Sequence, residues 1–385
     1  MKRTMENETN VATKLQKYST DDFDVVIISK ARLKKYYLNA NFQKFNNPCE
    51  LFENLNSFLK TEDAKIISQD FFGSCTLYNE CITSLKKTFG SIDWPVTWIQ
   101  GNGSENQKIT GTQVLAISGV TVSPISIGEQ IVGNAYESDA GHICYLGGLL
   151  PDNINKSNKE QTTEVFQKIE KALNSVGMDF SHVVRTWLYI NNILDWYDEF
   201  NVARTEFFNQ KKVFEGLVPA STGVGVSNPQ SAALVTEVLA IKPRPGKVQI
   251  EKVGSPLQCP ATDYKSSFSR AVEVKFSDYR RLYVSGTASI DGDGKTIFID
   301  DIVNQIARTM EVVEAILKSR NMGWEDVSRA IAYFPDLANA YLLAEYCKRN
   351  SIPDMPISIA HGDICRDDLL FEIEVDTVKL GTRNS

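Results

Sequence analysis

Two glutamates near the C-terminus have a spacing that could place a proton donor in a cleft. Glu372 and Glu374 are two residues apart in the apolar run Leu369–Val375, so in a β-strand both side chains point to the same side. A carboxylic acid that faces a closed, apolar cleft keeps its proton, because desolvation disfavours the carboxylate, and it can then act as a general acid. A glutamate on an edge strand would instead be solvated. The spacing alone leaves both alternatives open.

Arg185 has neighbours that suit either a ligand clamp or a structural ion pair. The run Val183–Tyr189 alternates in the manner of a β-strand, and Arg185, Trp187 and Tyr189 fall on one face of it. Arginine stays charged when buried and binds a carboxylate through two parallel hydrogen bonds. Tyr189 could donate a phenol hydrogen bond to the same ligand or be a core aromatic residue. Both are therefore candidate ligand-binding residues, with structural roles as the alternatives.

Further candidate ligand-binding residues lie on a predicted helix and in two polar segments. Arg204 follows a Trp-Tyr pair on the helix, and its alternative role is a salt bridge to a nearby acidic residue. Arg270 follows the small, polar run Ser266–Ser269. Ser221 and Thr222 occupy a Pro-Ala-Ser-Thr-Gly turn, where hydroxyl and backbone N–H groups either bind an anion or satisfy the turn itself.

The composition argues against nucleic-acid binding, metal catalysis and a serine triad. The 385-residue chain has a formal net charge of −7, so it lacks the basic surface that binds phosphate polymers. Its histidines, His142, His182 and His361, show no metal-ligand spacing, and its seven cysteines are scattered without a C-x-x-C pair. We therefore expect structural histidines, free thiols and no metal.

The hydropathy pattern predicts a cytoplasmic protein without a membrane segment. Residues Met1–Glu8 are polar and no apolar stretch follows them, so a secretory signal is not expected. No run approaches the roughly 18–20 apolar residues of a membrane-spanning helix.

The sequence predicts an N-terminal region, two α/β units and a linker. Hydrophobic residues make up 42% of the chain and charged residues 23%, which is a globular balance with enough apolar side chains for a sizeable core. The segment Lys242–Gly246 contains two prolines and a glycine, which cannot continue a strand or helix. The predicted boundaries are 1–110 for an N-terminal region that packs on the first unit, 111–243 for the first unit, 244–261 for the linker and 262–385 for the second unit.

The two units are diverged copies of one pattern. Each has a strand that ends in small residues, an amphipathic helix, an alternating strand, a second helix and a terminal strand. This order predicts an α/β (α+β) fold, in which each unit is a mixed sheet with helices on one face and the cleft between units is a favoured ligand site. Arg329 takes the place of Arg185 in the second copy. The matching segments are Tyr145–Pro151 and Tyr283–Ser289, Val183–Tyr189 and Val327–Tyr333, Trp196–Phe208 and Leu337–Arg349, and Ala233–Ile241 and Leu369–Val375.

The repeat resembles the RidA-like (YjgF-like) fold, and a longer series of motifs resembles the chorismatase family. The series runs from about residue 90 to 376 in the family's order, which makes the resemblance specific for close to three quarters of the chain. A fold by itself would not indicate an activity. The motifs are Trp94–Trp98, Val183–Tyr189, Ile193–Asn201, Leu217–Gly223, Ser255–Pro260, Ser266–Ala271, Val284–Ile290 and Cys365–Glu372.

The resemblance implies an enzyme that releases pyruvate from chorismate, a small dianion with an enol ether, without a cofactor. Protonation of the enol methylene carbon is slow and requires a positioned acid, which the resemblance places at Glu372, with Glu374 as second choice. It also implies that Ala288 and Cys365 determine the product. Cys365 points toward the 3-hydroxybenzoate branch and Ala288 toward plain hydrolysis, and we favour 3-hydroxybenzoate.

Other activities stay open at this point. Hydrolysis would give pyruvate and a dihydroxycyclohexadiene carboxylate. An imine deaminase of the RidA-like kind is opposed by Ser221 and Ser358, which stand where those enzymes carry an arginine near the turn. A binding module for a small aromatic acid is the non-catalytic alternative. We expect a monomer or a small homo-oligomer, because RidA-like folds often trimerise while two units in one chain can replace part of that contact.

Overall fold

The chain builds three six-stranded sheets in succession, as the computed structural model of residues 11–41, 48–100, 109–264 and 266–381 shows. Met1–Glu8 lie outside these described residues. The first unit consists of β1 (Lys14–Ser19), β2 (Asp24–Lys30), β3 (Leu33–Asn41), α1 (Pro48–Thr61), β4 (Lys65–Gly73), α2 (Tyr78–Phe89), β5 (Val96–Gln100) and β6 (Ile109–Ser118). The second consists of β7 (Val122–Ile127), β8 (Gln130–Glu137), β9 (Gly141–Leu149), α3 (Asn158–Ser175), β10 (Val183–Ile190), α4 (Ile193–Gln210), β11 (Ala220–Gly225) and β12 (Leu234–Pro243). The third consists of β13 (Gln249–Val253), β14 (Ala271–Lys275), β15 (Tyr279–Ala288), α5 (Ile302–Lys318), β16 (Val327–Phe334), α6 (Tyr341–Arg349), β17 (Ile357–His361) and β18 (Glu372–Leu380).

All three units share one strand order. The sheets run β5-β4-β6-β3-β2-β1, β11-β10-β12-β9-β8-β7 and β17-β16-β18-β15-β14-β13. In each sheet the last strand of the unit inserts between the third and fourth strands, and the fourth and fifth strands pair in parallel. The predicted fold class, tandem RidA-like units with mixed sheets and helices, is therefore confirmed, and the repeat occurs three times.

The N-terminal region differs from the expectation, because it is a complete copy of the repeat. The sequence predicted that residues 1–110 form an N-terminal region that packs on the first unit, yet the first sheet has the topology of the other two and ends at β6. The predicted linker 244–261 also contains β13, which pairs with β14 in the third sheet. Strand pairing therefore corrects both boundaries.

Local sequence explains why the elements form where they do. A capping box begins α3: the Ser157 hydroxyl accepts a hydrogen bond from the Glu160 amide at 3.3 Å, and the Glu160 carboxylate accepts one from the Ser157 amide at 3.0 Å. Val165, Ile169 and Leu173 then recur at helical spacing and are buried. The helix is thereby fixed at its start and held against the second sheet.

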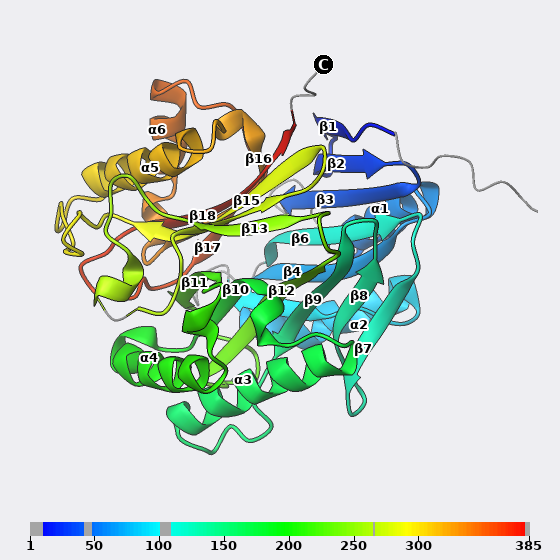
Figure 1. The fold of residues 1–385 in the computed structure, drawn as a ribbon, viewed down its shortest axis with the longest axis horizontal. Helices are drawn as coiled ribbons and strands as arrows, with labels where there is room; N and C mark the ends of the chain where they lie inside the picture. Colours follow the sequence, from blue (N-terminus) through cyan, green and yellow to red (C-terminus); the bar gives the residue numbers. More distant parts are fainter. Residues whose placement is uncertain (1–10, 42–47, 101–108, 265, 382–385) are drawn as a thin grey trace, which may run out of the picture.

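The helices lie at the periphery and the sheets meet in the middle (Figure 1). A central hydrophobic cluster joins buried side chains from all three sheets, such as Phe72, Val235 and Tyr333. Both faces of the inner strands are therefore covered, and β10 is buried along its whole length. None of the helices in the described ranges combines the length and the apolar character that a membrane span requires.

Candidate active site

A cleft of about 900 Å³ lies where the second and third units meet. Hydrogen bonds join the two units beside it: the Ser221 amide donates to the Ser285 hydroxyl at 2.8 Å, and the Ser269 hydroxyl donates to the Val218 carbonyl at 2.7 Å. A cleft of this size suits a small organic ligand. Six of the residues predicted from the sequence line it: Ser221, Arg204, Arg270, Ala288, Cys365 and Glu372.

Glu372 is the first residue of β18 and occupies a position that differs among the three units. It pairs with Tyr333 of β16 in the third sheet. The corresponding residue of the second sheet, opposite Tyr189, is Val235, and the corresponding residue of the first sheet is Gly111. Among these three equivalent positions, only the third unit carries a carboxyl group, so a carboxyl group at this position is specific to one of the three units.

The Glu372 carboxyl is set up to hold a proton at neutral pH. Only 5% of the residue is exposed. Burial, with the nearby charge of Glu374, raises the pKa of Glu372 to about 8, although Arg185 and Arg270 act in the opposite direction. A carboxylic acid with this pKa is neutral at pH 7 and can donate its proton to a ligand in the cleft.

A β-bulge in β15 makes room for this carboxyl group. The register between β15 and β18 shifts between Val284 and Thr287, so the chain bulges at Gly286. A Cβ atom at Gly286 would overlap Oε1 of Glu372 and would lie 3.1 Å from Cγ2 of Thr222. The Gly286 amide also donates to the Thr222 hydroxyl at 3.0 Å. Gly286 lies in the motif Val284–Ile290, but the sequence did not predict it as a site residue.

Three arginines supply positive charge to the cleft: Arg204, Arg270 and Arg366. Arg204 lies over the Phe200 ring and donates to the Ser266 hydroxyl at 3.4 Å. Arg270 donates through Nε and Nη2 to the carbonyl of Cys259, at 3.0 and 2.9 Å. Sequence reasoning missed Arg366, although it directly follows Cys365 in the last motif.

Arg185, Tyr189 and Thr222 do not line the cleft. Arg185 is fully buried behind it and donates through Nη2 to Glu374 at 2.8 Å and to the Thr222 hydroxyl at 2.6 Å. Tyr189 is buried in the central cluster. Of the two alternatives for Arg185, the contacts favour the structural ion pair, and Thr222 connects this pair to the bulge at Gly286.

The two residues predicted to select the product line the same cleft as Glu372. Ala288 is the direct partner of Glu372 across β15 and β18. Cys365 lines the same cleft, and burial together with Glu372 raises the pKa of its thiol to about 12. A thiol with this pKa stays protonated and is a poor nucleophile, so Cys365 contributes shape to the cleft.

Polar side chains contact one another between the first and third units, in the region that corresponds to the cleft between the second and third units. The Ser358 hydroxyl donates to Oδ1 of Asn39 at 2.8 Å, and Nε2 of Gln113 donates to Ser358 at 3.1 Å. Arg329, the counterpart of Arg185, donates to Glu374 at 2.7 Å and to Asp70 at 3.2 Å. Ser358 and Arg329 therefore belong to the interior between units.

Comparison with known proteins agrees with this architecture. The Endoribonuclease L-PSP family, which is the RidA-like family, matches residues 135–241. A crystal structure of a chorismatase superimposes with a TM-score of 0.62 and 16% identity, covering 91% of this chain and 100% of that one. The chain has the chorismatase fold. It is also similar in sequence to 3-hydroxybenzoate synthase of Streptomyces hygroscopicus, with 27% identity over 63% of this chain and 75% of that protein. A chorismatase of the same organism is 24% identical over 60% of this chain and 71% of its own length.

Proposed function

We propose that this protein is a chorismatase that releases pyruvate from chorismate, with Glu372 as the proton donor. The observation that carries the proposal is a buried carboxyl group, with a pKa of about 8, in a cleft lined by arginines. The similarity to a 3-hydroxybenzoate synthase and to chorismatases supports the same substrate.

Different residues of the cleft have different roles in the proposed reaction. Glu372 transfers its proton to the enol methylene carbon, which becomes a methyl group and leaves the positive charge on the ether-bearing carbon. Arg204, Arg270 and Arg366 are placed to bind the two carboxylates of the substrate. Burial of Glu372 is what keeps the proton available.

Capture of the cation decides the product, and we propose 3-hydroxybenzoate. Attack by water on the enolpyruvyl carbon would give the dihydroxycyclohexadiene carboxylate, while capture within the ring leads to the hydroxybenzoate. Ala288 and Cys365 line the cleft together with Glu372, so the room available to water in the cleft depends on both. The choice concerns roughly the volume of a methyl group, a difference of about 1–3 kcal/mol.

Two other functions have weaker support. An imine deaminase would need a cation in the turn, and Ser221 stands there with its hydroxyl 2.8 Å from that of Thr186. Binding of a small aromatic acid alone would not require a carboxyl group, such as that of Glu372, that keeps its proton at neutral pH.

An assay of pyruvate release tests the proposal. The purified protein, incubated with chorismate, should release pyruvate well above the spontaneous rate, and chromatography should show 3-hydroxybenzoate as the aromatic product. Pyruvate with the dihydroxycyclohexadiene carboxylate instead would retain the reaction class and overturn the product. Release at the spontaneous rate would overturn the whole proposal.

A further inference from the structure

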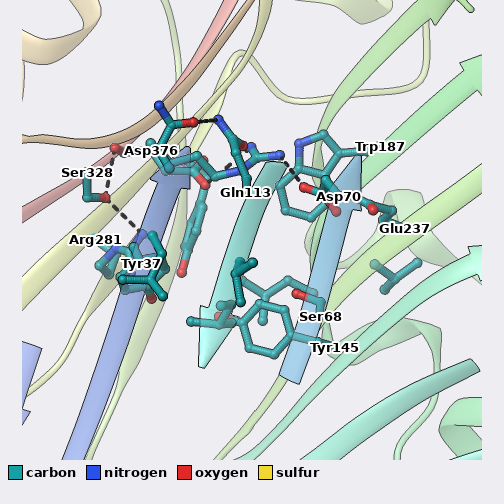
Figure 2. A pocket seen from close by; sticks show the side chains of 18 of the residues that line it. Tyr37, Ser68, Asp70, Gln113, Tyr145, Trp187, Glu237, Arg281, Ser328 and Asp376 are labelled. Carbon is teal, nitrogen blue, oxygen red and sulfur yellow. Dashed lines mark hydrogen bonds and ion pairs between the residues drawn. The ribbon is translucent and has the colours of Figure 1, made fainter. Parts of the chain in front are cut away.

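The centre of the molecule contains a second, smaller cavity that is separate from the cleft at Glu372. It has a volume of about 60 Å³ and is lined by residues of all three units (Figure 2). A neighbouring void of about 10 Å³ shares part of the same wall. The residues common to both are Tyr37, Tyr145, Leu239, Arg281 and Tyr283. Arg281 and Tyr37 lie on one side of the larger cavity, and Asp70 and Glu237 lie on the other (Figure 2).

Arg281 is a buried cation whose hydrogen bonds all go to neutral acceptors. Its Nε donates to the Thr377 carbonyl at 2.8 Å, its Nη2 to the Ser328 hydroxyl at 3.3 Å and its Nη1 to the Tyr37 hydroxyl. Only 2% of the residue is exposed. Among the described residues, no carboxylate lies within 4 Å of this guanidinium group. Asp376 lines the larger cavity and acts on Arg281 from farther away, while its ion pair is with Arg329, at 3.8 Å.

Lys35 is a second buried cation in the same place. It lines the smaller void and is 7% exposed. Its Nζ lies 5.5 Å from the ring centres of both Tyr136 and Phe276. In the part of the chain that the structure describes, Lys35 has neither an ion pair nor a side-chain hydrogen bond. Burial, with repulsion from Arg281, lowers its pKa to about 7, and both cations line the smaller void.

The other interior cations have counter-ions. Arg185 pairs with Glu374 at 2.8 Å, and Arg329 pairs with Glu374 at 2.7 Å and with Asp70 at 3.2 Å. A buried charge without a partner is costly, and the chain avoids this cost at Arg185 and Arg329. Asp376 and Asp139 act on Arg281 and Lys35 from a distance, but among the described residues neither cation has a carboxylate within 4 Å. The void that both cations line is therefore positioned for a negative charge in direct contact with them.

We propose that the smaller void binds a small monovalent anion, of the size of chloride, between Lys35 and Arg281. Ammonium and guanidinium groups supply the charge, and the hydroxyl groups of Tyr145 and Tyr283 line the shared wall as further donors. The smaller void, which Lys35 and Arg281 both line, has a volume of about 10 Å³, close to the roughly 10–15 Å³ that a single water-sized occupant requires. A dianion or an organic acid would be too large, which separates this site from the substrate cleft.

Anion binding should depend on pH in one direction. An anion stabilises the charged amine, so it binds most tightly below the pKa of Lys35 and more weakly as the pH rises above about 7. The charged and titratable groups that face Lys35 are Arg281, Asp139 and the phenols of Tyr37, Tyr136, Tyr145, Tyr279 and Tyr283.

Bromide can reveal the site directly. Crystals of the full chain grown in bromide should show an anomalous peak between Lys35 and Arg281. In solution, replacing gluconate by chloride at constant ionic strength should raise Tm by about 2–4 °C at pH 6 and by less at pH 9. Lys35→Met should abolish the chloride effect. Lys30→Met, which removes a surface-side lysine that pairs with Asp278 at 3.0 Å, is the matched control and should retain it.

Two results would overturn the proposal. One is bromide bound only at the molecular surface; the other is a chloride effect that Lys35→Met retains in full. Neither readout uses turnover, so the outcome does not depend on the proposed chorismatase activity.

Discussion

Glu372 and Glu374 share one face of β18 but differ in their surroundings. Glu374 accepts hydrogen bonds from Arg185, Arg329 and Trp187, at 2.8, 2.7 and 2.8 Å. Glu372 lies one step along the same face, against the open cleft and the glycine bulge. One carboxyl group therefore belongs to an interior ion-pair network, while its neighbour is free to exchange a proton with a ligand.

Replacing Glu372 should remove turnover and preserve binding. Glu372→Gln keeps the shape of the side chain but cannot give up a proton, so kcat for pyruvate release should fall by about 10²–10⁴-fold. The dissociation constant of a dianionic, non-reactive analogue, measured by calorimetry, should change little, because the arginines are intact. Full activity in this variant would remove Glu372 from the mechanism.

The activity of the wild-type protein should decline in alkaline solution. In the proposed mechanism the protonated form of Glu372 is the active one, so kcat/KM should be level below its pKa of about 8 and should fall about tenfold per pH unit above it. Steady-state rates of pyruvate release between pH 6 and 10 would show this decline, the alkaline limb of the kcat/KM profile. A rate that rises through pH 8 would mean that the essential group acts as a base.

The neighbours of Glu372 should move this alkaline limb in opposite directions. Glu374 raises the pKa of Glu372 and Arg185 lowers it. Glu374→Gln should therefore shift the limb of the kcat/KM profile to lower pH, and Arg185→Met should shift it to higher pH. Each variant breaks a buried ion pair and should lose about 3–5 kcal/mol of stability, which chemical denaturation can measure.

The sign of each shift separates electrostatic tuning from general damage to the fold. General loosening of the fold would not shift the alkaline limbs of the Glu374→Gln and Arg185→Met profiles in opposite directions. Limbs that move together, or that stay at the wild-type pH, would leave Glu374 and Arg185 with a structural role alone.

The sequence predicted the fold of the second and third units because their strands still have similar residue types at matching positions. The strand Val327–Tyr333 could be matched to Val183–Tyr189 by type and period, and both are strands in the structure. The first unit keeps the same topology with different residues, so only strand pairing reveals it.

The role of Arg185 could not be predicted from the sequence either. Alternation assigns its side chain to one face of the strand, but both faces of β10 are buried. Glu374 is 189 residues away in the chain, and only the tertiary structure brings it to Arg185.

Gly286 should tolerate no side chain. The Cβ of Gly286→Ala would overlap Oε1 of Glu372, so the carboxyl group must move, and displacement by about 1 Å can lower kcat by about 10²-fold. Gly292→Ala is the matched control, because a Cβ there meets no atom within 4 Å. Pyruvate release and thermal melting of both variants would show whether the loss is specific to turnover. Equal activity in the two variants would contradict the placement of Glu372 over the bulge.

The side chain of Cys365 should control the product and leave the first step intact. Cys365→Ala enlarges the cleft next to Glu372 without touching the acid, so water gains access to the cation and the product ratio should move toward the dihydroxycyclohexadiene carboxylate by about tenfold. Cys347→Ala, at a half-buried cysteine of α6 outside the cleft, is the control. Chromatography gives the ratio, and total pyruvate reports the protonation step, which precedes capture. If total pyruvate falls while the ratio stays constant, Cys365 supports the acid instead of shaping the space in which the cation is captured.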